Sequence, residues 1–137
     1  MTRTVRGGLR RYSILIVACV LATVLTGCGK ADPRTAKLVG KWKDPTGSTF
    51  SLATDGSFSG DMETATLNLK NVPPSVHVAG TWWIDGKDFV FKVAQSSWKS
   101  DKLVGTESKE RILSISENEY HTQDAKSGKY NDYTRVK

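Results

Sequence analysis

The fold is decided by residues 76–93, which read VHVAGTWWIDGKDFVFKV. Apolar and polar residues alternate on both sides of Asp85-Gly86, a pair that favours a two-residue turn between antiparallel strands. Because side chains alternate between the two faces of a strand, the hairpin has one core face and one more polar face. The predicted cross-strand pairs on the core face are Trp82 with Phe89, Gly80 with Phe91 and Val78 with Val93, and the other face carries Thr81, Trp83, Asp88, Val90 and Lys92.

Short β-prone runs separated by turn residues continue on both sides of this hairpin. Before them, Asp32-Pro33 predicts a short helix that ends at Leu38. A series of about seven to nine strands favours an all-β, antiparallel up-and-down barrel, because closure removes exposed strand edges. A two-sheet sandwich is the alternative. The expected strands are 39–43, 49–52, 58–62, 66–69, 76–84, 89–93, 111–115, 120–123 and 130–136, and 103–104 is either a further strand or part of a loop over 95–108.

The first 27 residues differ in composition from the rest of the chain. They hold four arginines and no acidic residue. Without them, 16 basic and 14 acidic residues remain, and the net charge falls from +6 to +2. A basic start followed by the apolar run 12–25 is typical of an export signal. The run is shorter than the roughly 20 residues that span a bilayer. The weak charge of the remainder gives no support to nucleic-acid binding.

The apolar run ends in Leu25-Thr26-Gly27-Cys28. This tetrapeptide resembles the lipobox of bacterial lipoproteins. The resemblance implies that the thiol of Cys28 receives a diacylglycerol, and that further acylation, for example by palmitate, completes a membrane anchor. It divides the chain into a signal peptide over 1–27, a lipidated cysteine and tether over 28–36, and a domain over 37–137.

The same resemblance predicts a location in the bacterial cell envelope, with the membrane as a partner through the lipid on Cys28. Gly29 stands where an Asp tends to retain such proteins in the inner membrane, so the outer membrane is favoured if the source is Gram-negative. The alternative is an uncleaved membrane helix with an incidental cysteine.

A second motif opens the first expected strand. Residues 38–42 read LVGKW, and they are followed by phenylalanine- and tryptophan-bearing hairpins and by a closing YTR at 133–135. This pattern resembles that of lipocalins and of small bacterial lipocalin-like proteins. The resemblance implies that Trp42, beside Gly40, plugs one end of the barrel, and that Arg135 packs across its ring.

No motif of catalysis or metal binding is present in the sequence. His77 and His121 lack the spacing of metal ligands, no serine lies in a Gly-x-Ser-x-Gly elbow, and no glycine-rich phosphate loop opens a helix. Cys19 and Cys28 lie at or before the processing point, so a disulfide or a cysteine nucleophile in the domain is not expected. We expect that the protein is not an enzyme and that it binds no metal and no cofactor.

Aromatic residues are the remaining lead to function. Inward-facing aromatics either line a ligand pocket or fill the barrel. The sequence predicts a lipid-anchored protein that binds a small apolar or amphipathic ligand and no nucleic acid. The alternative is a non-catalytic interaction module for an envelope protein, or an enzyme inhibitor, with a filled barrel and a contact surface at Trp83, Trp98 or 95–108. The candidate ligand-lining residues are Phe58, Trp82, Phe89 and Phe91.

Overall fold

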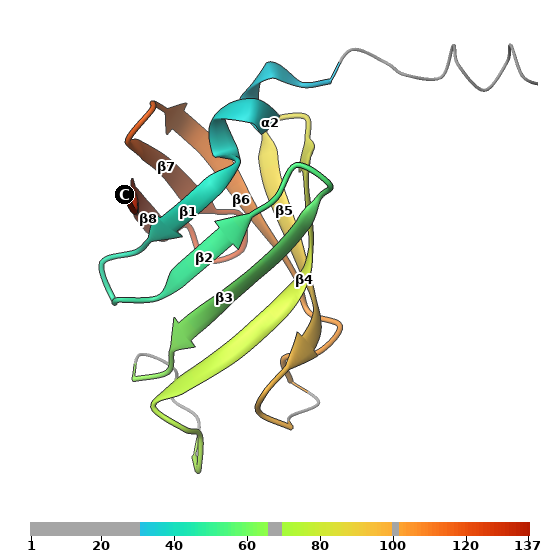
Figure 1. The fold of residues 1–137 in the computed structure, drawn as a ribbon, viewed down its shortest axis with the longest axis vertical. Coiled ribbons are helices and arrows are strands. Elements are labelled where there is room, and N and C mark those ends of the chain that lie inside the picture. Colours follow the sequence, from blue (N-terminus) through green and yellow to red (C-terminus); the bar gives the residue numbers. More distant parts are fainter. Residues whose placement is uncertain (1–30, 66–69, 100–101) are drawn as a thin grey trace, which may run out of the picture. The chain divides into compact units, whose positions relative to one another are not determined.

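The protein forms an eight-stranded barrel in a computed structural model that describes residues 31–65, 70–99 and 102–137. Each strand pairs antiparallel with the next one along the chain, and the last strand pairs with the first (Figure 1). The predicted closed up-and-down barrel is therefore confirmed, and the two-sheet sandwich is wrong. The elements are α2 (Pro33–Leu38), β1 (Gly40–Lys43), β2 (Thr49–Leu52), β3 (Ser57–Glu63), β4 (Ser75–Asp85), β5 (Asp88–Ser96), β6 (Glu107–Ile115), β7 (Glu119–Asp124) and β8 (Tyr130–Arg135).

Two ends of the barrel follow from this alternation. We call the end that carries α2 and the β2–β3, β4–β5 and β6–β7 connections the helix end. The opposite end, which carries the β1–β2, β3–β4, β5–β6 and β7–β8 connections, is the loop end (Figure 1). The expected strand over 66–69 lies outside the described residues, and residues 103–104 form a turn in the β5–β6 connection.

The helix α2 begins and ends as its sequence indicates. The Asp32 carboxylate accepts a hydrogen bond from the Arg34 amide at 2.9 Å, and Pro33 occupies the first turn, where no amide donor is needed. At the other end the Val39 amide bonds to the Thr35 carbonyl at 3.1 Å, and the next residue, Gly40, leaves the helix with φ at +139°. The helix places Leu38, which is fully buried, over its end of the barrel.

The register of the central hairpin differs from the predicted one. Asp85 pairs with Asp88, so the two turn residues are Gly86 and Lys87. Gly86 has φ at +60° in the first turn position, which is typical of a type II′ turn. The Arg34 side chain also holds the Gly86 carbonyl at 2.5 Å. The cross-strand pairs are consequently Ile84 with Phe89, Trp82 with Phe91 and Gly80 with Val93.

The face assignment of the hairpin is right despite the wrong register, because a shift of two residues preserves the alternation. Val78, Trp82, Phe89 and Val93 are buried in the core. A bulge between Ala79 and Gly80 shifts the register further along. A side chain at Gly80 would place its Cβ 1.9 Å from the Lys92 carbonyl oxygen, so only glycine fits this crossing of strands.

Val90 is an exception to the predicted polar outer face. It is fully buried although it belongs to the face opposite Phe89 and Phe91. Its cross-strand neighbours are Trp83 on β4 and Lys109 on β6. Long neighbouring side chains of this kind cover a small β-branched residue between them.

The core lies inside the barrel and is drawn entirely from residues of this one unit. Asp32–Lys137 form a compact unit with a complete ring of strands, and we therefore expect it to fold without the preceding residues. Among the described residues, no helix has the length and apolar character required to cross a membrane. The buried core residues are Leu38, Trp42, Leu52, Phe58, Val76, Val78, Trp82, Phe89, Val93, Tyr120 and Tyr133.

Candidate ligand-binding site

The helix end is sealed by a tryptophan and an arginine. Trp42 is fully buried, and its indole nitrogen donates a hydrogen bond to the Leu38 carbonyl at 2.7 Å. The guanidinium carbon of Arg135 lies 4.1 Å from the centroid of the Trp42 ring, within the range of a cation–π contact. Trp42 and Arg135 are also paired across β1 and β8, so the contact joins the first strand to the last.

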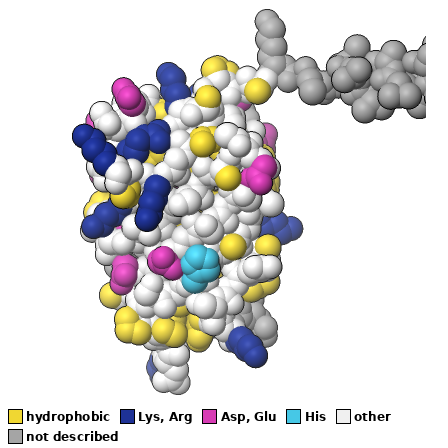
Figure 2. Space-filling model, in the orientation of Figure 1, with side chains coloured by type: hydrophobic (Ala, Val, Ile, Leu, Met, Phe, Trp, Pro, Cys, Tyr) yellow, Lys and Arg dark blue, Asp and Glu magenta, His cyan; other side chains and the backbone are white. Residues whose placement is uncertain are grey.

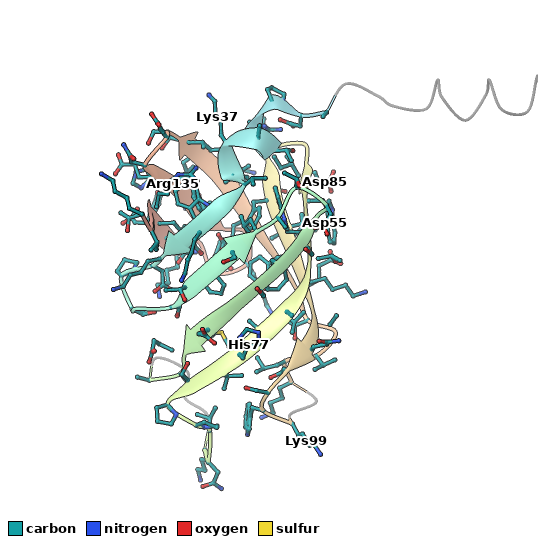
Figure 3. All side chains as sticks on the ribbon, viewed as in Figure 1. Lys37, Asp55, His77, Asp85, Lys99 and Arg135 are labelled. Carbon is teal, nitrogen blue, oxygen red and sulfur yellow. The ribbon has the colours of Figure 1, made fainter. Side chains whose placement is uncertain are left out.

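The Arg135 side chain donates hydrogen bonds to three backbone carbonyls. Its Nη2 and Nη1 atoms donate to the carbonyls of Lys37 and Val39 at 2.8 and 2.9 Å, and its Nε donates to the Glu117 carbonyl at 2.5 Å. The first two carbonyls lie at the end of α2, where helix geometry leaves acceptors without partners. Figure 3 shows Arg135 close to this helix and to Lys37. The planar guanidinium thus ties α2 and the β6–β7 connection to β8.

Gly40 leaves the space that this arrangement needs. A Cβ at this position would lie 2.1 Å from Nη1 of Arg135. The structure therefore brings together Gly40, Trp42 and Arg135, the three residues that the family resemblance selected for barrel closure.

An apolar cavity of about 190 Å³ lies inside the barrel. Three of the four candidate ligand-lining residues, Phe58, Phe89 and Phe91, contribute to its wall. Ligand sites commonly measure about 300–1,000 Å³, whereas an engineered cavity of about 150 Å³ accepts benzene. The cavity therefore suits a ligand of about one ring. Its wall consists of Phe50, Leu52, Phe58, Met62, Val78, Phe89, Phe91, Val93, Leu103, Thr106, Ser108, Tyr120 and Tyr133.

Trp82, the fourth candidate, is not part of the cavity wall. Its indole nitrogen donates to the Ala53 carbonyl at 3.1 Å in the β2–β3 connection, and its ring packs against Phe89 with centroids 5.9 Å apart. The side chain is only 3% exposed, so it fills the core at the helix end. The prediction that Trp82 lines the pocket was wrong because inward orientation does not fix depth along the barrel.

The cavity reaches the surface at the loop end. Thr106, in the β5–β6 connection, is exposed and yet belongs to the cavity wall, and half-buried Leu103 lies beside it. The connection is fastened to β5, because Val93 exchanges backbone hydrogen bonds with Gly105 and Thr106 at 2.8 and 3.0 Å. Figure 2 shows hydrophobic side chains gathered at this end of the molecule. Sequence reasoning missed Leu103, Thr106 and Ser108 because no periodicity marks 95–108.

A buried carboxylate, which no sequence pattern indicated, lies near the cavity. Glu110 faces into the barrel from β6 and is only 5% exposed. The hydroxyls of Thr122 and Tyr133 donate to it at 2.6 and 3.1 Å, and the Asn131 amide donates at 3.2 Å. Burial raises the pKa of Glu110, an effect that the hydrogen bonds from Thr122 and Tyr133 oppose.

Two tyrosines connect this carboxylate to the cavity wall. The rings of Tyr120 and Tyr133 are stacked with centroids 4.3 Å apart, and Trp42 meets Tyr120 edge-on at 4.7 Å. Aromatic contacts of both kinds are favourable and hold the rings in place. The sealed helix end and the cavity wall are therefore one packed unit.

The histidines lie on the outer surface, each beside an aspartate. The Nδ1 atom of His77 is 2.9 Å from an Asp61 carboxylate oxygen, and that of His121 is 2.6 Å from one of Asp132. Figure 3 labels His77 on β4. The hydrogen bond to Asp132 raises the pKa of His121. Within the three described ranges, no group of three or more His, Cys, Asp or Glu side chains could hold a metal ion.

The two tryptophans expected on the surface differ in exposure. Trp83 is 39% exposed on the outer face of β4. Trp98 is half-buried and packs against the core, so the expectation that it is exposed was wrong, whereas its role in contacting a partner stays a prediction. Cys28 lies outside the described residues.

Comparisons with known proteins agree with the geometry of the barrel. No model of a protein family matched the chain, and no curated protein matched it either. Among solved structures, the chain is similar to a lipocalin-like protein from Bacteroides uniformis, with a TM-score of 0.51 and 13% sequence identity over 73% of this chain and 99% of that one. Identity at this level establishes the fold alone. The domain has a lipocalin-like fold.

Replacing Arg135 with lysine tests the sealed end. Arg135→Lys keeps the positive charge but cannot reach three carbonyls or stack flat on Trp42. We expect the free energy of unfolding, measured with urea, to fall by about 1–3 kcal/mol, because backbone carbonyls lose their donor and the flat contact with the Trp42 ring is lost. The matched control is Arg111→Lys at an exposed position of β6, which should change the value by less than about 0.5 kcal/mol. Equal losses in the two variants would contradict this role of Arg135.

The pH dependence of stability tests the burial of Glu110. Its folded-state pKa is raised above the ordinary value of 4.5, so its contribution to stability is present below about pH 4.5 and is lost as pH rises through the folded-state pKa. We expect the wild type to lose free energy of unfolding relative to Glu110→Gln as the pH rises above about 4.5. Glu107→Gln, exposed on the same strand, is the control. Parallel profiles of the wild type and Glu110→Gln would show that Glu110 has no such effect.

Proposed function

We propose that this chain is a lipid-anchored lipoprotein of the bacterial cell envelope whose lipocalin-like barrel binds a small apolar or amphipathic ligand without catalysing a reaction. The observation that carries the proposal is the apolar cavity of about 190 Å³ that opens at the loop end. A barrel that served only as a rigid scaffold would be more stable with this volume filled, because voids forfeit packing energy.

The chemistry of the cavity wall supports binding of an apolar body with a small polar group. Aromatic rings from β2, β3, β5, β7 and β8 surround the space, and four hydroxyl-bearing residues, Thr106, Ser108, Tyr120 and Tyr133, also line it. Predominantly apolar walls with a few polar groups are characteristic of ligand sites. Entry at the loop end leaves the sealed helix end undisturbed.

The anchoring part of the proposal rests on the amino-terminal sequence. Cys28 follows Leu25, Thr26 and Gly27 in the arrangement of a lipobox. A single acyl chain binds membranes only marginally, at about 0.8 kcal/mol per buried methylene, whereas two or three chains retain a protein. The outer membrane is the proposed location in a Gram-negative envelope.

One observation favours the interaction module as a second candidate. The exposed Trp83 borders a surface hollow near α2, together with Thr35 and Ile84. Exposed tryptophans are enriched at protein interfaces. This hollow lies at the helix end, so a contact there would be independent of the cavity, which opens at the loop end.

Filling the cavity tests the binding proposal. Ser108→Phe directs a ring from β6 into the cavity, and Lys109→Phe places the same ring on the outer face as a matched control. Residues 29–137 are incubated with an envelope lipid extract and weighed by native mass spectrometry. We expect the wild type and Lys109→Phe to carry an added mass that disappears on denaturation, and Ser108→Phe to carry none.

Two results would count against binding in the cavity. One is an unmodified mass for the wild type after incubation. The other is an added mass that Ser108→Phe retains while its thermal unfolding shows an intact fold, which would place the ligand elsewhere.

Replacing the cysteines tests the anchor. Full-length protein is expressed in bacteria supplied with radiolabelled palmitate. We expect Cys28→Ser to lose the label, because it removes the thiol that begins lipidation, and Cys19→Ser to keep it. Label on Cys28→Ser, or its loss from Cys19→Ser, would be incompatible with the lipobox.

A further inference from the structure

We infer that the cavity selects an uncharged, hydroxyl-bearing ligand of about one ring, with the Tyr120 hydroxyl as its hydrogen-bonding anchor, and that it discriminates against carboxylates of the same shape. This inference rests on the proposed function of ligand binding and adds the chemical class of the ligand. It depends on three observations, which concern the Tyr120 hydroxyl, the charge near it and the size of the space.

Tyr120 is a fixed element of the cavity wall. Its side chain is only 2% exposed, and its ring meets Trp42 at an interplanar angle of 87° and is stacked on Tyr133. Because Trp42 is itself locked by its bond to Leu38 and by Arg135, the Tyr120 ring has little freedom to turn away from the cavity.

The Tyr120 hydroxyl has no hydrogen-bond partner in the described part of the chain, whereas the Tyr133 hydroxyl donates to Glu110. Buried tyrosine hydroxyls usually find a partner, because an enclosed polar group without one is costly. No fully enclosed side-chain oxygen or nitrogen among the described residues lacks a partner. The Tyr120 hydroxyl therefore borders open space, and the space that its residue lines is the cavity.

The charge around this hydroxyl is negative. Burial raises the pKa of Tyr120 well above its ordinary value, and the carboxylates of Glu110 and Asp44 act in the same direction. The hydroxyl thus stays protonated and can donate to, or accept from, a neutral partner.

A ligand carboxylate would find no compensating charge here. Among the described residues that line the cavity there is no Lys, Arg or His. Glu110 lies behind Tyr133 with three neutral donors and forms no ion pair with any described residue. An anion in the cavity would lose its hydration and face a second buried carboxylate, which is strongly unfavourable.

The volume limits the apolar body of the ligand. About 190 Å³ exceeds the cavity of about 150 Å³ that binds benzene and falls below the usual range of drug-sized sites. A single ring with one short polar substituent fits this space, and a polycyclic ligand does not.

Three molecules of matched shape test the inference, namely benzyl alcohol, toluene and benzoate. Dissociation constants for residues 29–137 are measured by ligand-observed NMR at neutral pH. We expect benzyl alcohol to bind about two- to tenfold more tightly than toluene, the usual net value of one hydrogen bond, and benzoate to bind at least about tenfold more weakly than benzyl alcohol.

Two tyrosine variants assign the preference to one hydroxyl. Tyr120→Phe keeps the stacked ring. It should raise the dissociation constant of benzyl alcohol by about two- to tenfold and leave that of toluene unchanged. Tyr133→Phe removes a hydroxyl that is already committed to Glu110, so it should leave the ratio between the two ligands as in the wild type. Glu110→Gln should reduce the difference between the dissociation constants of benzoate and benzyl alcohol, because it removes the buried carboxylate.

The outcomes separate this inference from the proposal beneath it. If none of the three molecules binds the folded wild type, ligand binding in the cavity is overturned and the inference falls with it. If they bind but toluene matches benzyl alcohol, if benzoate binds best, or if Tyr120→Phe leaves the preference intact, binding stands and the selection for a hydroxyl is overturned.

Discussion

The contact of the Arg135 guanidinium with the Trp42 ring is the interaction on which the rest of the structure depends. β1 and β8 share only two register pairs, Trp42 with Arg135 and Lys43 with Thr134, so the closing seam of the barrel is its shortest. Arg135 reinforces this seam through three backbone carbonyls and covers the ring that plugs the helix end. A rigid, always charged fork suits this task better than an ammonium group would. Because the seam is closed, the barrel is sealed at the helix end and the cavity opens at the loop end.

Aromatic packing extends from the sealed helix end to the cavity wall. Trp42 fixes Tyr120, Tyr120 stacks on Tyr133, and the Tyr133 hydroxyl bonds to Glu110. Two features of this chain oppose stability, since a void and a buried carboxylate without a cation both raise the free energy of the fold. The void is the cavity itself and Glu110 lies close to its wall, at a place where stability is commonly sacrificed for function. Their coincidence supports a site that binds something, rather than a barrel that only presents its surface.

The sequence was sufficient for the faces of the strands and insufficient for their depth. Alternation put Phe58, Phe89 and Phe91 on the inner side correctly, because side-chain orientation follows from a period of two. The hairpin register was wrong because Asp85-Gly86 and Gly86-Lys87 both place a glycine in a tight turn, and the bond from Arg34 to Gly86 is a tertiary contact that no local pattern shows. Trp82 was misplaced because depth along a barrel depends on stagger between strands. Glu110 escaped notice because burial of an acidic residue depends on donors from two other strands.

The central claim is that the barrel encloses an accessible apolar space. Xenon binding tests this claim most directly. Xenon enters apolar cavities of this size and is located by its electron density. In crystals of residues 29–137 held under xenon pressure, we expect a xenon atom inside the barrel in contact with Phe58 and Phe91. An interior without xenon, in which the rings of Phe58, Phe91 and Tyr133 fill the space between them, would contradict the account.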